Sequence, residues 1–143
     1  MTYQIVSERS EPAYRISSPS DAYKAFSRYA KARTERFLVA VLNGAHEVNR
    51  VVIVSIGSLN RTVVTPSEVF FPCIRFAGVA CLLGHNHPSG KLDPSPEDIE
   101  ITRRLREGGE LLGISVLDHL IVGPKGGFYS FIEHGLIVPS NLD

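Results

Sequence analysis

The sequence is poor in the residues that mark secreted, redox-active or membrane-embedded proteins. It has no tryptophan, one methionine and two cysteines, Cys73 and Cys81. Both cysteines stand in apolar surroundings without a Cys-x-x-Cys spacing, so we expect buried, reduced thiols and no disulfide framework. No apolar run reaches the roughly 18 residues of a membrane span, and the first residues lack the basic and apolar regions of a signal peptide. These absences favour a cytoplasmic protein that makes no membrane contact.

The chain also lacks a charge excess of either sign, with 15 Lys and Arg against 15 Asp and Glu. Binding that depends on neutralising phosphates needs a strong basic excess or a basic face. Zero net charge therefore argues against a nucleic-acid partner, although it leaves a local basic patch open. The apolar content of 43% and the charged content of 21% are those of a globular protein. With 143 residues, the region 1–143 is expected to form one domain around one core.

Strand and helix patterns alternate along the chain. Apolar or β-branched runs predict strands at residues 3–6, 37–42, 48–56, 78–83, 114–122 and 128–131. Cap and proline signals predict helices that begin near Ser20, the expected N-cap, near Pro66 and at Pro96. Gly113 should end the third helix, and Pro72 should kink or shorten the second. This order predicts an α/β domain with a mixed β-sheet flanked by α-helices.

The most informative segment follows the predicted strand 78–83 and contains two imidazoles and a carboxylate. His85 and His87 are two residues apart, so in an extended chain both imidazoles point to the same side. Asp98 falls in the first turn of the next predicted helix, and the intervening loop can bring it beside them. Two nitrogens and one carboxylate oxygen suit Zn²⁺ and leave a fourth position open for water, as in catalytic zinc sites.

Each part of this segment also has a purely structural explanation. His-x-His is a common pair, and helix capping accounts for Ser95 and Asp98. The contiguous letters His85-Asn86-His87 do not indicate a nuclease, because the three residues that give such nucleases their name lie far apart in sequence. The spacing therefore predicts a metal site but leaves the alternative of a simple helix cap open.

With its surroundings, this segment resembles a known family. The string His85-x-His87-Pro88-x(6)-Pro94-Ser95-x(2)-Asp98 resembles the JAMM motif of JAB/MPN metalloproteins. The strings at 102–105, 112–114 and 118–123 are similar to the RadC branch of that superfamily, and the similarity runs from about residue 16 to residue 136. The resemblance implies a JAB/MPN-type, cytidine-deaminase-like mixed β-sheet flanked by α-helices.

The resemblance also implies a role for each matched residue. His85, His87 and Asp98 match the zinc ligands of the family. Ser95 matches a serine whose hydroxyl helps to stabilise the oxyanion of a tetrahedral intermediate. The activity implied for these residues is that of a zinc-dependent hydrolase, a metallopeptidase or isopeptidase that acts on a peptide or protein.

The family uses an upstream glutamate as general base and then as proton donor to the leaving group. Attack by water on an amide needs such a group, because a proton must reach a poor leaving amine. Glu35, just before the predicted strand 37–42, matches this position best. Glu68 is the other candidate, but it already suits the third position of a capping box that follows Thr65.

Asp118 and His119 form a second pair of candidate ligands. Adjacent side chains of a strand face opposite ways, so at most one of the two can point into the site. We expect a hydrogen-bonding role in the core or behind the metal ligands for this pair.

Two other classes of function stay open. Some MPN domains have lost their ligands and act as non-catalytic binding modules, whereas the ligand set of this chain is complete. The RadC resemblance also suggests a factor in DNA repair or a metal-dependent nuclease. Full-length RadC-like proteins usually carry an N-terminal helix-hairpin-helix region, and this chain is expected to have no room for one, which weakens a DNA role. A zinc nucleobase deaminase is disfavoured because no Pro-Cys-x-x-Cys pair is present.

Overall fold

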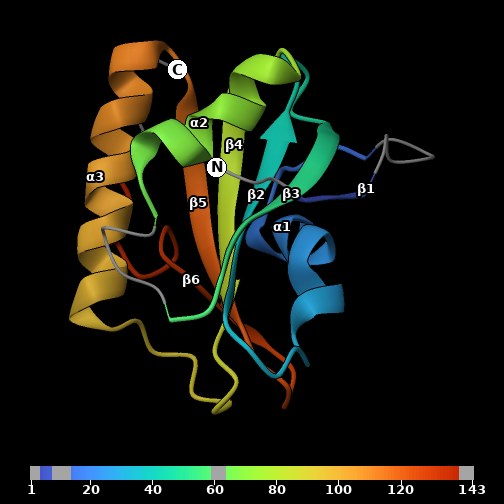
Figure 1. The fold of residues 1–143 in the computed structure, drawn as a ribbon, viewed down its shortest axis with the longest axis vertical. Helices are drawn as coiled ribbons and strands as arrows, with labels where there is room; N and C mark the ends of the chain where they lie inside the picture. Colours follow the sequence, from blue (N-terminus) through green and yellow to red (C-terminus); the bar gives the residue numbers. More distant parts are fainter. Residues whose placement is uncertain (1–3, 8–13, 59–63, 139–143) are drawn as a thin grey trace.

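The computed structural model describes residues 4–7 (backbone only), 14–58 and 64–138. Six strands form one sheet in the order β1-β3-β2-β4-β5-β6 (Figure 1). They are β1 (Gln4–Ser7), β2 (Arg36–Leu42), β3 (Val48–Ile56), β4 (Ala80–Asn86), β5 (Ser115–Val122) and β6 (Phe128–Ser130). β4 and β5 pair in parallel, and the other neighbouring strands are antiparallel. The predicted mixed sheet is confirmed, except that Tyr3 of the first predicted strand lies outside the described residues.

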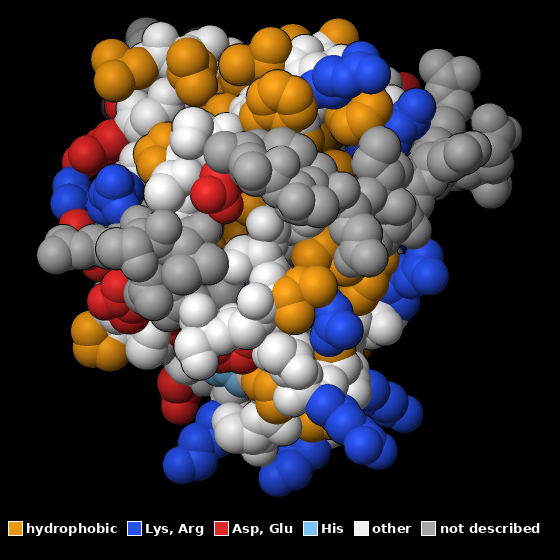
Figure 2. Space-filling model, in the orientation of Figure 1, with side chains coloured by type: hydrophobic (Ala, Val, Ile, Leu, Met, Phe, Trp, Pro, Cys, Tyr) orange, Lys and Arg blue, Asp and Glu red, His pale blue; other side chains and the backbone are white. Residues whose placement is uncertain are grey.

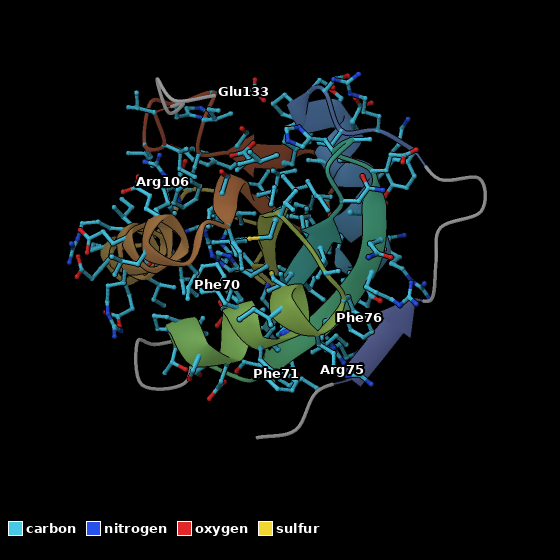
Figure 3. All side chains as sticks on the ribbon, turned by 90° about the horizontal axis from the view of Figure 1, so that it is seen from above. Phe70, Phe71, Arg75, Phe76, Arg106 and Glu133 are labelled. Atoms are coloured by element: carbon cyan, nitrogen blue, oxygen red, sulfur yellow. The ribbon has the colours of Figure 1, made fainter. Side chains whose placement is uncertain are left out.

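Helices cover both faces of the sheet. One face carries α1 (Pro19–Phe26) and the 3-10 turn η1 (Ser27–Tyr29), and the other carries α2 (Pro66–Arg75) and α3 (Pro96–Leu112) (Figure 3).

The alternation of side chains in β2 supplies both apolar layers. Leu38 and Ala40 belong to the core under α1, whereas Val39 and Val41 belong to the core under α2 and α3. Because this strand is buried on both faces, its sequence is a continuous apolar run. The same alternation in β4 decides which of its polar residues can meet α3.

A serine or threonine followed by proline begins each helix. Ser18, Thr65 and Ser95 are the N-caps, and proline occupies the first helical position after each. The Ser18 hydroxyl accepts a hydrogen bond from the Asp21 N–H, so the prediction of Ser20 as the first cap was wrong. A proline that fixes the first helical position requires the cap to precede it, and Ser20 therefore lies inside the helix.

The second helix continues past its internal proline. Pro72 lies within α2, which runs on to Arg75. A proline removes one intrahelical hydrogen bond. Phe70 and Cys73, on either side of Pro72, are buried against the sheet and hold this part of the helix in place. Of the two predicted effects of Pro72, the shortening was therefore wrong, whereas the kink stays a prediction.

The structure bears on two features of the sequence, its low cysteine content and its lack of a long apolar run. Cys73 and Cys81 are buried free thiols, as predicted. A hydrogen bond between them raises the pKa of the Cys81 thiol well above its usual value, and burial adds to this rise. Within residues 4–7, 14–58 and 64–138, no helix has both the length and the apolar character that crossing a bilayer requires.

The contact between α1 and β4 requires a glycine. A Cβ at Gly84 would lie 2.6 Å from Cγ of the fully buried Phe26 ring. We expect Gly84→Ala to lower the free energy of unfolding by about 2 kcal/mol, because the ring has no free space to move into. Urea denaturation measures this change. Gly44→Ala is the matched control, since nothing lies within 4 Å of a Cβ there, and an equal effect of both variants would contradict the argument.

Candidate metal centre

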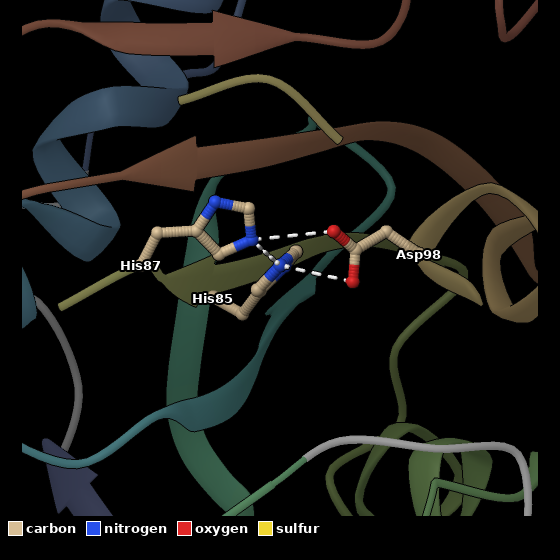
Figure 4. Close-up of side chains that lie close together, drawn as sticks. All are labelled: His85, His87 and Asp98. Carbon is tan, nitrogen blue, oxygen red and sulfur yellow. Dashed lines mark hydrogen bonds and ion pairs between the residues drawn. The ribbon is translucent and has the colours of Figure 1, made fainter. Parts of the chain in front are cut away.

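The end of β4 and the start of α3 bring two imidazoles and a carboxylate together (Figure 4). His85 Nε2 lies 2.9 Å from His87 Nε2. Asp98 Oδ1 lies 3.4 Å from His85 Nε2, and Asp98 Oδ2 lies 3.2 Å from His87 Nε2. The three residues with metal-ligand spacing in the sequence therefore form one cluster that could hold a metal ion.

The separations within this cluster fit a tetrahedral ion. Zinc bonds of about 2.0–2.1 Å at tetrahedral angles put neighbouring ligand atoms about 3.3 Å apart. The three distances of 2.9, 3.2 and 3.4 Å lie close to this value, so little movement would be needed to admit the ion. A larger ion such as Ca²⁺ prefers six to eight oxygen ligands and fits this nitrogen-rich set poorly.

The His87 imidazole is oriented by a backbone carbonyl in the loop after β4. Its Nδ1 lies 2.8 Å from the Lys91 carbonyl oxygen, which can only accept, so Nδ1 carries the proton. In the neutral ring Nε2 then presents a lone pair to the Asp98 carboxylate. Only the protonated ring can donate its Nε2–H to Asp98, and this hydrogen bond raises the pKa of His87, while burial opposes the rise. A positive charge is therefore favoured at the centre of the cluster, where a proton or a cation can supply it.

Asp98 serves the helix and the cluster at the same time. Its Oδ2 accepts the Ser95 N–H at 2.8 Å, and its own N–H donates to Ser95 Oγ at 3.0 Å, which completes the predicted capping box. Burial alone would raise the pKa of this carboxyl. The neighbouring His85 and His87 imidazoles outweigh that effect and hold the pKa well below the usual range. The carboxylate is therefore ionised, and Oδ1 stays available to a metal.

His119 and Asp118 stand behind the cluster. The His119 ring is fully buried, it stacks on Phe131 at 4.4 Å between centroids, and burial lowers its pKa well below the usual value. Its Nε2 lies 2.7 Å from His85 Nδ1. Asp118 accepts hydrogen bonds from the Ser130 hydroxyl and from the His119 N–H. The prediction of a hydrogen-bonding role for this pair is confirmed, and only His119 contacts a residue of the cluster.

Asn86 lies between the two histidines and points to the opposite side of the strand, where it is fully buried. Its Oδ1 accepts the Arg36 N–H at 2.7 Å. Its Nδ2 donates to the Ala32 and Thr34 carbonyl oxygens at 3.1 and 3.2 Å. No sequence pattern predicts a role for this residue, although the alternation of β4 separates it from His85. Asn86 fastens the loop that precedes β2 to the strand that carries the histidines.

That loop carries Glu35. β2 pairs with β4 in antiparallel register with Phe37 opposite His85, so continuing the register by two residues places Glu35 opposite His87. The negative charge of Glu35 contributes to the raised pKa of His87, after the larger effect of Asp98. The backbone therefore brings Glu35 to the edge of the cluster, on the side of the partly exposed His87.

Loss of the Asn86 carboxamide is expected to destabilise this end of the sheet. Asn86→Ala removes three hydrogen bonds to the loop 32–36, and we expect the free energy of unfolding to fall by about 3 kcal/mol. Asn49→Ala is the control, because Asn49 makes one bond to a distant segment, from Nδ2 to the Phe76 carbonyl, besides a longer one of 3.3 Å from the adjacent Arg50, and about 1 kcal/mol is expected there. Chemical denaturation compares the two, and equal losses would contradict the assigned role.

The remaining predicted residues differ in their surroundings. Ser95 is exposed at the start of α3, and its Oγ accepts the Asp98 N–H, so its hydroxyl proton stays free to donate elsewhere. Glu68 lies in the first turn of α2, where its N–H donates to Thr65 Oγ1 at 3.4 Å. The half of the predicted capping box that the Thr65 hydroxyl forms is thus present, and it explains the backbone position of Glu68.

Known sequences that match this chain include a family model and several curated relatives. A sequence model described as the RadC-like JAB domain matches residues 16–136. A UPF0758 protein of Trichlorobacter lovleyi is 48% identical over 130 residues, which cover 90% of this chain and 56% of the relative. A UPF0758 protein of Geotalea uraniireducens is 46% identical over 130 residues, covering 90% and 57%. A UPF0758 protein of Methanosarcina mazei is 40% identical over 128 residues, covering 89% and 56%. The chain thus spans little more than half the length of these curated relatives.

Proposed function

Because the chain belongs to the RadC-like JAB domain family and gathers His85, His87 and Asp98 in one cluster, we propose that it is a zinc-dependent hydrolase. The proposed reaction is cleavage of an amide bond in a peptide or protein, as by a metallopeptidase or isopeptidase. The observation that carries the proposal is the convergence of two Nε2 atoms and an ionised carboxylate at tetrahedral spacing. The His87 side chain is 13% exposed, so a substrate can approach from that side.

The three clustered residues would hold the ion, and other side chains would move the protons. A bound zinc ion would supply a Lewis acid that polarises the scissile carbonyl and lowers the pKa of a coordinated water. Glu35, at the edge of the cluster beside His87, would accept the proton of the attacking water. The same carboxyl would then donate that proton to the leaving amine, which cannot depart as an anion.

Ser95 would assist at the carbonyl oxygen. Its Oγ accepts the Asp98 N–H, which fixes the oxygen while the hydroxyl proton remains free. That proton can be donated to the oxygen that becomes negative during attack, the general role of an oxyanion-hole donor. The capping bond thus orients Ser95 and leaves its donor function intact.

Metal analysis combined with a peptidase screen tests the proposed function. We expect about one zinc ion per chain and cleavage of at least one peptide or isopeptide substrate by the zinc-loaded protein. A chelator should abolish the cleavage, and added zinc should restore it. Stoichiometric zinc without any cleavage across a broad peptide library would favour the non-catalytic binding module.

The surface near the cluster favours an acidic substrate. Figure 2 shows Lys and Arg side chains gathered at the end of the molecule where part of a histidine is visible. The segments 27–36, 87–95 and 123–127 carry six basic residues against two acidic ones: Arg28, Lys31, Arg33, Arg36, Lys91 and Lys125 against Glu35 and Asp93. The carbon chain of Lys125 lies over Gly90, since a Cβ there would be 3.2 Å from Lys125 Cδ. We propose that acidic side chains flank the bond that is cut.

The same basic segments give the nucleic-acid alternative a specific test. Charge reversal at Lys31 and Arg33 should weaken cleavage of acidic peptides, and reversal at the remote Arg75 serves as the control. A gel shift with duplex DNA at submicromolar protein, weakening steeply as salt rises, would favour the DNA-associated alternative. Binding of acidic peptides without such a shift would support the peptide substrate.

A further inference from the structure

We propose that His119 and Thr102 are positioning residues that hold His85 in the tautomer able to bind a metal through Nε2. The inference rests on the proposed metal site and adds two residues outside its ligand set. Both are almost completely buried, Thr102 on α3 and His119 on β5. They connect the strand that carries His85 to the helix that carries Asp98.

The chain of hydrogen bonds begins at the backbone of a proposed ligand. The Thr102 hydroxyl donates to the Asp98 carbonyl oxygen at 2.8 Å, and that oxygen can only accept. A hydroxyl has one proton, so toward His119 Nδ1, 2.5 Å away, the Thr102 oxygen must accept. His119 therefore carries its proton on Nδ1.

The proton on His119 Nδ1 determines the state of His85. A neutral imidazole has one N–H, so His119 Nε2 presents a lone pair to His85 Nδ1 at 2.7 Å. His85 Nδ1 must then be the donor, and its Nε2 is left with a lone pair. That lone pair faces His87 Nε2 and Asp98 Oδ1, where the ion is proposed to bind.

Packing holds the His119 ring in place within this relay, the hydrogen-bonded series Asp98, Thr102, His119 and His85. The His119 ring stacks on Phe131 and meets the edge of Phe37 at 5.5 Å between centroids. Without His119 as acceptor, His85 could carry its proton on either nitrogen, and the form protonated on Nε2 cannot bind the metal through that atom. A ligand-orienting partner of this kind typically changes metal affinity by about 10- to 100-fold.

The affinity test uses a matched pair of substitutions at Thr102. Thr102→Val keeps the shape of the side chain and removes the hydroxyl, whereas Thr102→Ser keeps the hydroxyl. We expect zinc affinity, measured by competition with a chromophoric chelator, to fall about 10- to 100-fold in Thr102→Val and to stay near wild type in Thr102→Ser. His119→Phe should lose at least as much as Thr102→Val. His46→Asn, in the hairpin loop between β2 and β3, should change nothing.

A second readout follows the tautomer directly in the zinc-free protein. Histidine side-chain nitrogen NMR should show the His85 proton on Nδ1 in wild type and in Thr102→Ser, and a mixture of tautomers in Thr102→Val. Unchanged affinity and an unchanged His85 tautomer in Thr102→Val would overturn the inference, even if His119→Phe failed to fold. If wild type binds no zinc, the proposed function fails, while the NMR comparison still decides the role of the relay.

Discussion

Replacing His85 with alanine is expected to abolish stoichiometric zinc binding and all cleavage that depends on it. His85 Nε2 is the central atom of the cluster, at 2.9 Å from His87 Nε2 and 3.4 Å from Asp98 Oδ1. The loss in zinc affinity should be larger than about 100-fold, which is the largest loss expected when a residue that only orients a ligand is removed. Metal content after gel filtration and a chelator competition measure it.

A control separates the loss of a ligand from general damage to the fold. His85 is fully buried, so its truncation also removes packing against Phe37. His87→Ala removes a partly exposed ligand and should lose zinc with a smaller effect on stability. His46→Asn should keep zinc. Retention of one zinc ion and full activity by His85→Ala would contradict the proposed mechanism.

Glu35→Gln is expected to separate metal binding from proton transfer. The variant keeps the size of the side chain and removes the base, so zinc affinity should stay near that of wild type. Turnover should fall by about 100- to 10,000-fold, the usual contribution of a general acid-base residue. Steady-state kinetics of the zinc-loaded protein on a substrate found by the peptidase screen measures the loss.

Glu68→Gln is the matched control for this prediction. Its backbone position is explained by the start of α2, and its charge is expected to play no part in the reaction. Activity should therefore persist in this variant. Loss of turnover in Glu68→Gln together with normal turnover in Glu35→Gln would reassign the base.

The sequence predicted those features that depend on local patterns. The strand 48–56 matches β3, and Gly113 caps α3 with a positive φ of 73°. The capping box of Ser95 and Asp98 also follows from four neighbouring residues. The prediction failed at the first cap, where the proline rule favours Ser18. The predicted shortening at Pro72 failed too, because burial of the flanking side chains maintains the helix.

The features that could not be predicted depend on contacts between distant segments. The spacing of His85, His87 and Asp98 indicated a cluster, but the bonds from Asn86 reach back more than fifty positions to residues 32 and 34. The link between His85 and His119 requires the parallel pairing of β4 with β5. No local pattern encodes such pairings, so these partners became visible only in three dimensions.

A crystal structure of the zinc-loaded protein, with anomalous scattering measured at the zinc edge, is the decisive test of the proposed metal site. We expect one strong peak about 2.0–2.2 Å from His85 Nε2, His87 Nε2 and an Asp98 oxygen, with the Glu35 carboxylate beside the open position. A peak held by other residues, or no peak in crystals grown with saturating zinc, would contradict the proposed metal site.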